Sequence, residues 1–349
     1  MLVKQAALIG LGMVAPTYIA ALRDLERDGT VRLRGVHARS GDSRQSFIRQ
    51  HGPGLLDYAS VEEIAGDPEV DFAILVTPPN ARLEAVRTLA GAGKPILMEK
   101  PVERTVEAAK TLCRICRDRG LPLGITLQHR MRPAVIELRE RIANENFGPL
   151  CAFEISLPWW RPQSYYDEPG RGTYARDGGG VMISQAIHIL DLALSFMPPV
   201  ASVSAMAETT ELHAMESEDF VIAGLRLEGG ATGSFFATTA AFPGRTEEIH
   251  LHFREASIAL VGNRFTIAGH DGSQRAGGES PDEKAGTGSG ANPMAFTHEW
   301  HRSIILDFAE ALDSGREPLV SGDKALAVHR VIEAIERSAR EGKRVTLGG

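Results

Sequence analysis

The first third of the chain alternates short apolar runs with amphipathic segments. The apolar runs predict strands at residues 6–9, 31–36, 72–76, 95–98 and 121–127. The segments between them predict helices at residues 16–25, 43–50, 61–65, 82–92 and 106–119. Strands and helices that alternate at this spacing are typical of β-α-β units. We therefore predict a Rossmann-type, doubly wound parallel sheet in an N-terminal α/β domain of residues 1–126.

Beyond residue 126 the pattern changes to longer strands of alternating polarity. A helix at 134–144 precedes expected strands at 151–157, 203–212, 220–227, 231–240, 247–253, 256–262 and 264–269. Strands that follow one another without intervening helices predict a mainly antiparallel sheet. Residues 269–293 are rich in glycine and predict a surface loop, and helices are expected at 298–312 and 324–340. Residues 127–349 are thus expected to form an α+β domain, with its last helices able to pack back on the first domain.

Composition narrows the class of protein. The 349 residues carry 38 basic and 45 acidic side chains, a net charge of −7, and the basic ones are scattered. A nucleic-acid partner would require a basic stripe, so we expect none. No apolar run reaches the length that spans a bilayer, so we expect no membrane partner and a cytoplasmic protein.

Three cysteines invite a redox or metal interpretation. Cys113 and Cys116 form a C-x-x-C pair inside a predicted helix, and Cys151 stands apart. No second pair of cysteines or histidines completes a four-ligand set. We therefore expect reduced, half-buried thiols and no metal site.

A glycine fingerprint follows the first predicted strand. The stretch LIGLGMVAP places Gly10, Gly12 and Ala15 in the pattern G-x-G-x-x-A, with Met13 and Val14 between them. The first glycine permits a tight turn, the second allows a pyrophosphate to approach the backbone, and the small third residue lets the helix pack closely. In the first unit of an alternating pattern, this loop predicts a dinucleotide-binding site.

The end of the second predicted strand bears on the choice of dinucleotide. An acidic residue there would bind the ribose hydroxyls of NAD, whereas an arginine would accept the 2′-phosphate of NADP. The sequence has Ala38, Arg39 and Ser40 at this point, without an acid. NADP(H) is therefore favoured. NAD(H) stays open, because Arg39 is alternatively an ordinary solvated side chain.

Five motifs occur in order along the chain: GLGMVA, TPPN, MEKP, QHRMRP and DGGGVMISQAIHILD. On these motifs the sequence resembles the glucose–fructose oxidoreductase / inositol dehydrogenase / rhizopine catabolism (Gfo/Idh/MocA) family. The resemblance implies an N-terminal nicotinamide-binding domain and a C-terminal domain with a large open sheet. It also implies sugars, polyols or their acids as substrates, and homo-oligomers, dimers or tetramers, that associate through the sheet.

The same resemblance implies roles for individual residues. Lys100 and His188 stand where family members carry the lysine and histidine that take part in hydride transfer. Side chains expected to line the cofactor are Thr77, Pro78, Asn80, Glu99 and Lys100. The chemistry agrees, since a histidine can accept the hydroxyl proton near neutral pH while a lysine hydrogen-bonds the developing oxyanion.

The helix that carries His188 departs from the family at one position. Ser184 stands where many relatives have aspartate or asparagine, and serine can bind a substrate hydroxyl but cannot carry charge. Helical spacing puts Ser184, His188 and Asp191 on one face. Asp191 either orients the imidazole or caps a neighbouring element, and the sequence does not decide between the two.

A long connection before this helix is rich in aromatic and arginine side chains, namely Trp159, Trp160, Arg161, Gln163, Tyr165, Tyr166, Arg171 and Arg176. Flat apolar faces with convergent donors suit a sugar or sugar-acid pocket. Arg161 and Tyr166 are the leading substrate contacts, together with Ser184, His188 and Lys100. The alternative is that these aromatics brace a subunit interface.

The sequence thus predicts an NAD(P)-dependent oxidoreductase acting on a carbohydrate-like secondary alcohol or ketone. Two alternatives remain open. One is an enzyme that uses its cofactor transiently, during elimination or glycoside cleavage. The other is a dinucleotide-sensing protein without turnover, against which the presence of both Lys100 and His188 argues.

Overall fold

A computed structural model describes residues 3–52, 54–278 and 297–348 of the chain. They divide into two compact units. The N-terminal unit comprises Met1–Gln128 and Thr297–Leu326, and the C-terminal unit comprises His129–Phe296 and Ala327–Gly349. Each unit has its own sheet.

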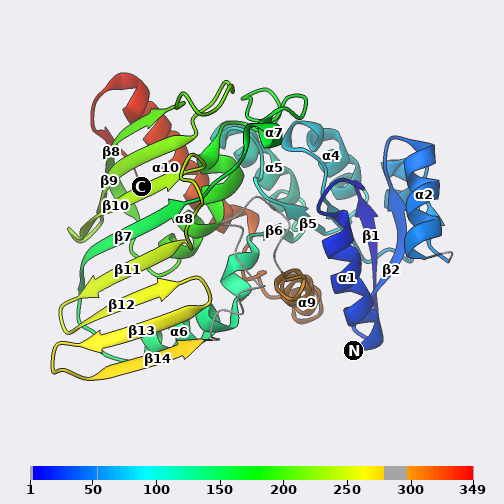
Figure 1. Ribbon diagram of the computed structural model, residues 1–349. Coiled ribbons are helices and arrows are strands. Elements are labelled where there is room, and N and C mark those ends of the chain that lie inside the picture. The colour runs from blue at the N-terminus through cyan, green and yellow to red at the C-terminus, as the bar shows by residue number, and fades with distance from the viewer. Residues whose placement is uncertain (1–2, 53, 279–296, 349) are drawn as a thin grey trace. The chain divides into compact units, whose positions relative to one another are not determined.

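The N-terminal unit is built on a six-stranded parallel sheet with the strand order β3-β2-β1-β4-β5-β6 (Figure 1). Its strands are β1 (Lys4–Ile9), β2 (Val31–His37), β3 (Leu56–Asp57), β4 (Phe72–Leu75), β5 (Ile96–Glu99) and β6 (Leu123–Thr126). Every residue of β4, β5 and β6 is buried, as in a parallel sheet covered on both faces. The predicted doubly wound α/β fold is confirmed.

The helices of this unit are α1 (Ala15–Arg27), α2 (Gly41–His51), α3 (Val61–Gly66), α4 (Leu83–Gly91), α5 (Val106–Arg117) and α9 (Glu299–Ser314). Side-chain caps begin several of them, because the hydroxyl oxygens of Ser40, Ser60 and Thr105 accept backbone N–H groups of the first turn. Glu63 completes the cap of α3 by accepting from Ala59 N at 2.7 Å.

Helix α9 belongs to the N-terminal unit although it follows the second sheet in the sequence. It packs on α1, and its Phe308 ring meets Phe72 of β4 edge-on, with the ring centroids 5.4 Å apart. Gly124 of β6 makes room for this helix, since a Cβ there would lie 2.7 Å from Phe308. The last helix, α10 (Gly322–Glu341), begins in this unit and continues into the other.

The C-terminal unit contains a nine-stranded sheet in the order β14-β13-β12-β11-β7-β10-β9-β8-β15. Its strands are β7 (Leu150–Pro158), β8 (Val200–Glu208), β9 (Phe220–Leu227), β10 (Thr232–Thr238), β11 (Glu248–Phe253), β12 (Ala256–Val261), β13 (Arg264–Gly269), β14 (Gln274–Gly278) and β15 (Val345–Thr346). Strands β7 and β10 pair in parallel and the other neighbours are antiparallel. The predicted mainly antiparallel sheet is confirmed.

One face of this sheet is apolar and buried, while the other is largely open. Ile155 of β7 lies opposite Phe235 on one side and Ile249 on the other, and all three are buried. The neighbouring positions on the opposite face, such as Glu154 and Ser234, are exposed. Helix α8 (Ile187–Leu194) packs against β7, and α6 (Pro133–Asn144) packs against β13 and β14.

Two predictions at the edges of strands were wrong. The strand expected at 203–212 ends at Glu208, because the Asp219 carboxylate binds the backbone N–H and hydroxyl of Thr210 and turns the chain. The loop expected at 269–293 contains β14, which adds to β13 through backbone pairing and so leaves no apolar signature. Residues 279–293 of that loop lie outside the described residues.

No helix in the described part of the chain is both long enough and apolar enough to cross a bilayer.

Candidate active site

The glycine turn after β1 is formed as a dinucleotide fingerprint requires. Gly10 has φ +103°, and a Cβ there would lie 3.0 Å from the backbone nitrogen of Thr77, so only glycine fits. Around Gly12 a Cβ would meet nothing within 4 Å, which leaves the backbone approachable. Strand β1 lies between β2 and β4, at the reversal of strand order where doubly wound folds bind ligands.

The start of α1 suits an anion. Val14 and Ala15 lead into the helix, Pro16 occupies its first turn, and no acidic residue stands there. The backbone N–H groups of such a helix end carry a partial positive charge. Met13 is 52% exposed beside them.

Thr77 follows β4 at the same edge of the sheet. Its Oγ1 is buried and has no hydrogen-bond partner in the structure. A buried hydroxyl without a partner is costly, which a bound polar ligand would relieve. Pro78 and Asn80 are exposed, before and within the short 3₁₀ turn Pro79–Ala81. The edge formed by Gly10, Gly12 and Thr77 therefore fits a nucleotide cofactor.

Arg82 ties the loop after β4 to the loop after β5. It is fully buried and donates to the carbonyl oxygen of Thr77 through Nε and Nη2, at 3.0 and 2.8 Å. Its Nη1 donates to the carbonyl of Glu99 at 2.6 Å and to that of Pro101. Burial lowers the pKa of Arg82 to about 10. The sequence analysis gave Arg82 no role.

Lys100 is the residue that follows β5, and its peptide bond to Pro101 is cis. Its side chain is half-buried. The backbone N–H of Lys100 donates to Oε2 of Glu99 at 3.0 Å. Glu99 thus binds the backbone at Lys100, and its predicted place beside the cofactor stays a prediction.

Glu99 itself is held in a buried polar cluster. The Tyr18 hydroxyl donates to its Oε1 at 2.9 Å, and His301 Nε2 lies 3.6 Å from the same oxygen. Burial raises the pKa of Glu99, but contacts with His301, Lys100 and Tyr18 outweigh it, so the pKa lies below its ordinary value. Tyr18 and His301 carried no recognisable signal, since they are distant in sequence from Glu99.

The turn after β2 contains the residues expected to choose the dinucleotide. Arg39 is exposed, and the carbonyl of Ala38 accepts from Arg44 at 2.7 Å. The Ser40 hydroxyl accepts from Ser43 N at 3.3 Å and so caps α2. No acidic side chain lies among residues 37–40.

In the C-terminal unit, His188 lies on α8 and is 8% exposed. Met182–Ala186, directly before it, form a π-helix. Such insertions are frequent at functional sites, and here the α-helical spacing assumed between Ser184 and His188 does not apply. Ser184 is half-buried, while every other residue from 181 to 193 is buried.

Glu218 fixes the start of this helical segment. Its carboxylate oxygens accept from the backbone N–H groups of Gly180 and Met182, each at 3.1 Å. Burial raises the pKa of Glu218, and these two hydrogen bonds oppose the rise. The contact joins positions 38 residues apart, so no local sequence pattern revealed it.

Asp191 does not cap an element, nor is it bonded to the imidazole. Both of its carboxylate oxygens accept from Arg130, at 2.7 and 2.6 Å. Burial raises the pKa of Asp191, and Arg130 offsets part of the rise. Neither alternative from the sequence holds, because the nearby arginine provides a stronger, two-point partner.

A second histidine accompanies His188. The imidazole of His129 stacks on that of His188, with the ring centroids 4.6 Å apart and the planes inclined by 26°. Arg132 Nη2 lies 2.7 and 2.9 Å from the two ring nitrogens of His129. The same Arg132 atom donates to Oε1 of Glu247 at 2.8 Å.

The two leading substrate candidates are buried. Arg161 is 2% exposed and its guanidinium lies over the rings of Trp159 and Tyr165, at 5.2 and 5.6 Å from their centroids. The hydroxyl of Tyr166 is 2.6 Å from Oγ1 of Thr239. The hydroxyl of Tyr165 instead accepts from Nε2 of Gln185, the residue after Ser184, at 3.2 Å.

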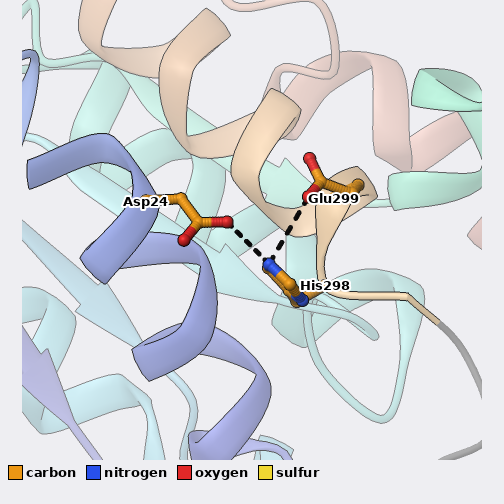
Figure 2. Close-up of side chains that lie close together, drawn as sticks. All are labelled: Asp24, His298 and Glu299. Carbon is orange, nitrogen blue, oxygen red and sulfur yellow. Dashed lines mark hydrogen bonds and ion pairs between the residues drawn. The ribbon is translucent and has the colours of Figure 1, made fainter. Parts of the chain in front are cut away.

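The remaining groups that could bind a metal or undergo redox chemistry are the cysteines and one cluster of potential metal ligands. Cys113 and Cys116 are buried free thiols whose pKa values burial raises, to about 12 and about 11. Within the described ranges, one set of three side chains could hold an ion: Asp24, His298 and Glu299 (Figure 2). His298 Nε2 lies 2.8 Å from Asp24 Oδ2, so the nitrogen that would ligate a metal is already hydrogen-bonded between α1 and α9.

The structure therefore gathers the expected cofactor residues at one edge of the N-terminal sheet. They end or follow β1, β2, β4 and β5 and are Gly10, Gly12, Met13, Val14, Ala38, Arg39, Ser40, Thr77, Pro78, Asn80, Glu99 and Lys100. The other candidates, Arg161, Tyr166, Ser184 and His188, belong to the C-terminal unit.

Comparison with known proteins identifies the family to which the two domains belong. Residues 4–127 match the oxidoreductase family with an NAD-binding Rossmann fold, and residues 135–274 match the GFO/IDH/MocA C-terminal domain. The chain is 23% identical over 325 residues to scyllo-inositol 2-dehydrogenase (NADP(+)) IolW of Bacillus subtilis, with 87% of each chain covered. It is 28% identical over 245 residues to 1,5-anhydro-D-fructose reductase of Ensifer adhaerens, covering 70% of this chain and 72% of the other.

Solved structures share the fold. Levoglucosan dehydrogenase in its apo form superposes with a TM-score of 0.85 at 21% identity, with both chains fully covered. The WlbA dehydrogenase of Bordetella pertussis, in complex with NADH and UDP-GlcNAcA, gives 0.84 at 24% identity, covering 99% of this chain and 98% of the other. The two family matches, over residues 4–127 and 135–274, show that the chain belongs to the GFO/IDH/MocA family of oxidoreductases.

Proposed function

We propose that this chain is a dehydrogenase or reductase that moves a hydride between a nicotinamide cofactor and a secondary alcohol or ketone of a sugar, polyol or sugar acid. The observation that carries the proposal is the carboxyl edge of the N-terminal sheet. There the open Gly12 backbone, the partnerless hydroxyl of Thr77 and the strand-end Lys100 occur together.

Residues 1–126 are assigned to the dinucleotide, together with Thr297–Leu326 of the same unit, and the rest of residues 127–349 to the substrate. The bound nicotinamide supplies the hydride acceptor or donor. The N–H groups at the start of α1 hold its pyrophosphate, and Thr77 offers a hydrogen bond.

Lys100 and His188 divide the remaining chemistry. The ammonium group of Lys100 hydrogen-bonds the substrate oxygen on which negative charge develops. His188 accepts the hydroxyl proton during oxidation and returns it during reduction, since an imidazole titrates near neutral pH. Ser184, the half-buried residue four positions earlier in the sequence, binds a neighbouring substrate hydroxyl.

A carbohydrate-like substrate is supported by the side chains around Arg161. Its guanidinium is buried against two aromatic rings, and Tyr166 lies in the same segment. The substrates in the names of the relatives, an inositol and an anhydro sugar, belong to the same chemical class.

NADP(H) is the preferred cofactor in this proposal. The turn after β2 lacks the acid that would repel a 2′-phosphate, and it presents exposed Arg39 at the start of α2. One relative is named for NADP(+), and NADH occupies a solved neighbour, so the preference is open to a direct test.

Self-association through the open face of the nine-stranded sheet is also proposed. Met206, Ile222 and Phe236 lie opposite one another on three neighbouring strands of that face. Met206 and Ile222 are 48% and 46% exposed, an apolar row that a second copy would cover. Ile222→Lys is expected to shift the mass measured by light scattering toward the monomer.

The test of function is a substrate screen with wild-type protein and both dinucleotides, followed by the absorbance of reduced nicotinamide. We expect oxidation or reduction of at least one polyol, sugar or keto-sugar, with NADP(H) bound more tightly than NAD(H). Arg39→Ala is expected to weaken NADP(H) binding about tenfold and to leave NAD(H) unchanged. Cofactor binding without turnover of any substrate would support a sensor instead.

A further inference from the structure

The stacked histidine pair points to a residue that the family motifs did not single out. We propose that His129 is a positioning residue, whose uncharged imidazole fixes the ring plane of His188. This rests on the proposed role of His188 in proton transfer. All the groups involved belong to the C-terminal unit.

Because the two imidazoles are stacked, the contact orients the His188 ring and does not relay a proton. At 4.6 Å between centroids and 26° between planes, the two rings face one another, so their nitrogens do not point at each other. A proton cannot pass along a hydrogen bond that this geometry does not make. What the stack does is restrict rotation of the His188 ring.

Arg132 determines the charge of His129. One guanidinium nitrogen lies within 3 Å of both ring nitrogens, at 2.7 and 2.9 Å. Because the two nitrogens point in different directions, an atom at such similar distances from both stands over the ring. A cation at this distance strongly disfavours a second positive charge on the imidazole.

Glu247 offsets the free-energy cost of burying that cation. Arg132 and Glu247 have side chains that are 1% and 3% exposed, and they are 2.8 Å apart. Arg132 also donates to the carbonyl of Gly262 at 3.2 Å. The pair is thus nearly neutral as a whole while its cationic end faces His129.

Further charged groups lie on the elements that carry the pair. Arg130 and Asp191 form an ion pair, and Arg139 adds a second cation within reach of both charges. With Arg132 against His129 and this further cation nearby, a second positive charge on the histidine pair is disfavoured, and the proposal assigns proton transfer to His188 alone. The missing acid at Ser184 is in this way compensated by orientation rather than by a second proton carrier.

The charge can be followed by NMR of protein labelled with ¹³C at histidine Cε1. His129→Asn and His188→Asn identify the two signals. In wild type we expect the His188 signal to titrate and the His129 signal to keep its neutral position down to about pH 5. In Arg132→Met/Glu247→Leu, which removes both buried charges together, His129 is expected to titrate near its ordinary pKa of about 6.5. Titration of His129 at that pH already in wild type would overturn the proposal.

Orientation is tested with a matched pair of variants. His129→Phe keeps an aromatic face and is expected to retain kcat within about threefold, whereas His129→Ala is expected to lose at least about tenfold. The KM for the dinucleotide should not change in either. Equal loss in both variants, or none in His129→Ala, would contradict an orienting stack. If wild type turns over no substrate, the proposed function fails, while the NMR titration still decides the charge of His129.

Discussion

Arg130 holds the carboxylate of Asp191 with two hydrogen bonds, at 2.7 and 2.6 Å, and so joins the segment after β6 to the middle of α8. His129, directly before Arg130, stacks on His188, three residues before Asp191. The QHRMRP segment thus contacts α8 at two residues: Arg130 binds Asp191, and His129 stacks on His188.

Asp191→Asn should be damaging for stability. The side chains of Asp191 and Arg130 are 2% and 12% exposed, and removing the charge of Asp191 leaves the mostly covered Arg130 without its charged partner. We expect a loss of about 3 kcal/mol in the free energy of unfolding, measured by urea denaturation. The matched control is Arg130→Met/Asp191→Leu, which removes both charges and should lose less. If Asp191→Asn is as stable as wild type, the ion pair does not have the role described.

Arg82→Leu should weaken both loops of the cofactor edge. The buried guanidinium binds the carbonyl oxygens of Thr77, Glu99 and Pro101, and leucine would leave them without donors. We expect about 2–4 kcal/mol less stability and dinucleotide affinity at least about tenfold weaker. Arg87→Ala, an exposed arginine on α4, the helix that Arg82 precedes, serves as the control. Unchanged dinucleotide affinity, measured by fluorescence titration, would argue against this positioning role.

Gly180→Ala is expected not to fold as wild type does. A Cβ at Gly180 would lie 1.8 Å from the carbonyl oxygen of Glu218, a backbone atom that cannot turn aside. Gly66 of α3 has nothing within 4 Å of its Cβ position, so Gly66→Ala should be neutral or slightly stabilising. Thermal unfolding of the two variants checks this contrast. Equal melting temperatures would mean that the chain passes Glu218 less closely than described.

Glu336 makes stability depend on pH in a definite direction. Burial, and then the charge of Glu218, raise its pKa to about 8. Between its ordinary pKa of about 4.3 and pH 8, the folded chain keeps a proton that the unfolded chain releases, so stability falls as pH rises. Glu336→Gln abolishes this loss.

The measurement is urea denaturation of wild type and Glu336→Gln at pH 5 and at pH 8. We expect the variant to gain about 1–2 kcal/mol over wild type between the two pH values, less than the full shift implies because Glu336 is only half-buried. Glu333→Gln, an exposed position on the same helix, should show no such change. A constant difference between wild type and Glu336→Gln would rule out the raised pKa.

Most of the fold could be predicted from the sequence, because periodicity and caps are local signals. The strands of the N-terminal sheet, the cap at Ser60 and the strand Phe220–Leu227 all follow from residues adjacent in the chain. β14 could not be predicted, because its residues contribute backbone pairing without an apolar alternation. The π-helix Met182–Ala186 also gives no periodicity distinct from that of an α-helix over five residues.

The candidate site likewise contains residues with a local sequence signal and residues without one. Gly10 and Gly12 could be assigned from spacing, since the turn they make is local. The partners that hold the site are distant in sequence: Glu218 for the start of the π-helix, Arg130 for Asp191 and His301 for Glu99. Only a folded chain brings such residues together, and a single sequence has no local pattern that links them.

The central claim is that Lys100 and His188 act on a substrate beside a bound nicotinamide. The most direct measurement is single-turnover reduction or oxidation of the nicotinamide, read by absorbance, in wild type, Lys100→Ala and His188→Asn. Lys324→Ala and His270→Asn, both exposed, are the matched controls. We expect each site variant to bind the dinucleotide normally and to lose about 10²–10⁴-fold in rate, with both controls unchanged. Wild-type rates in Lys100→Ala or His188→Asn would contradict the account.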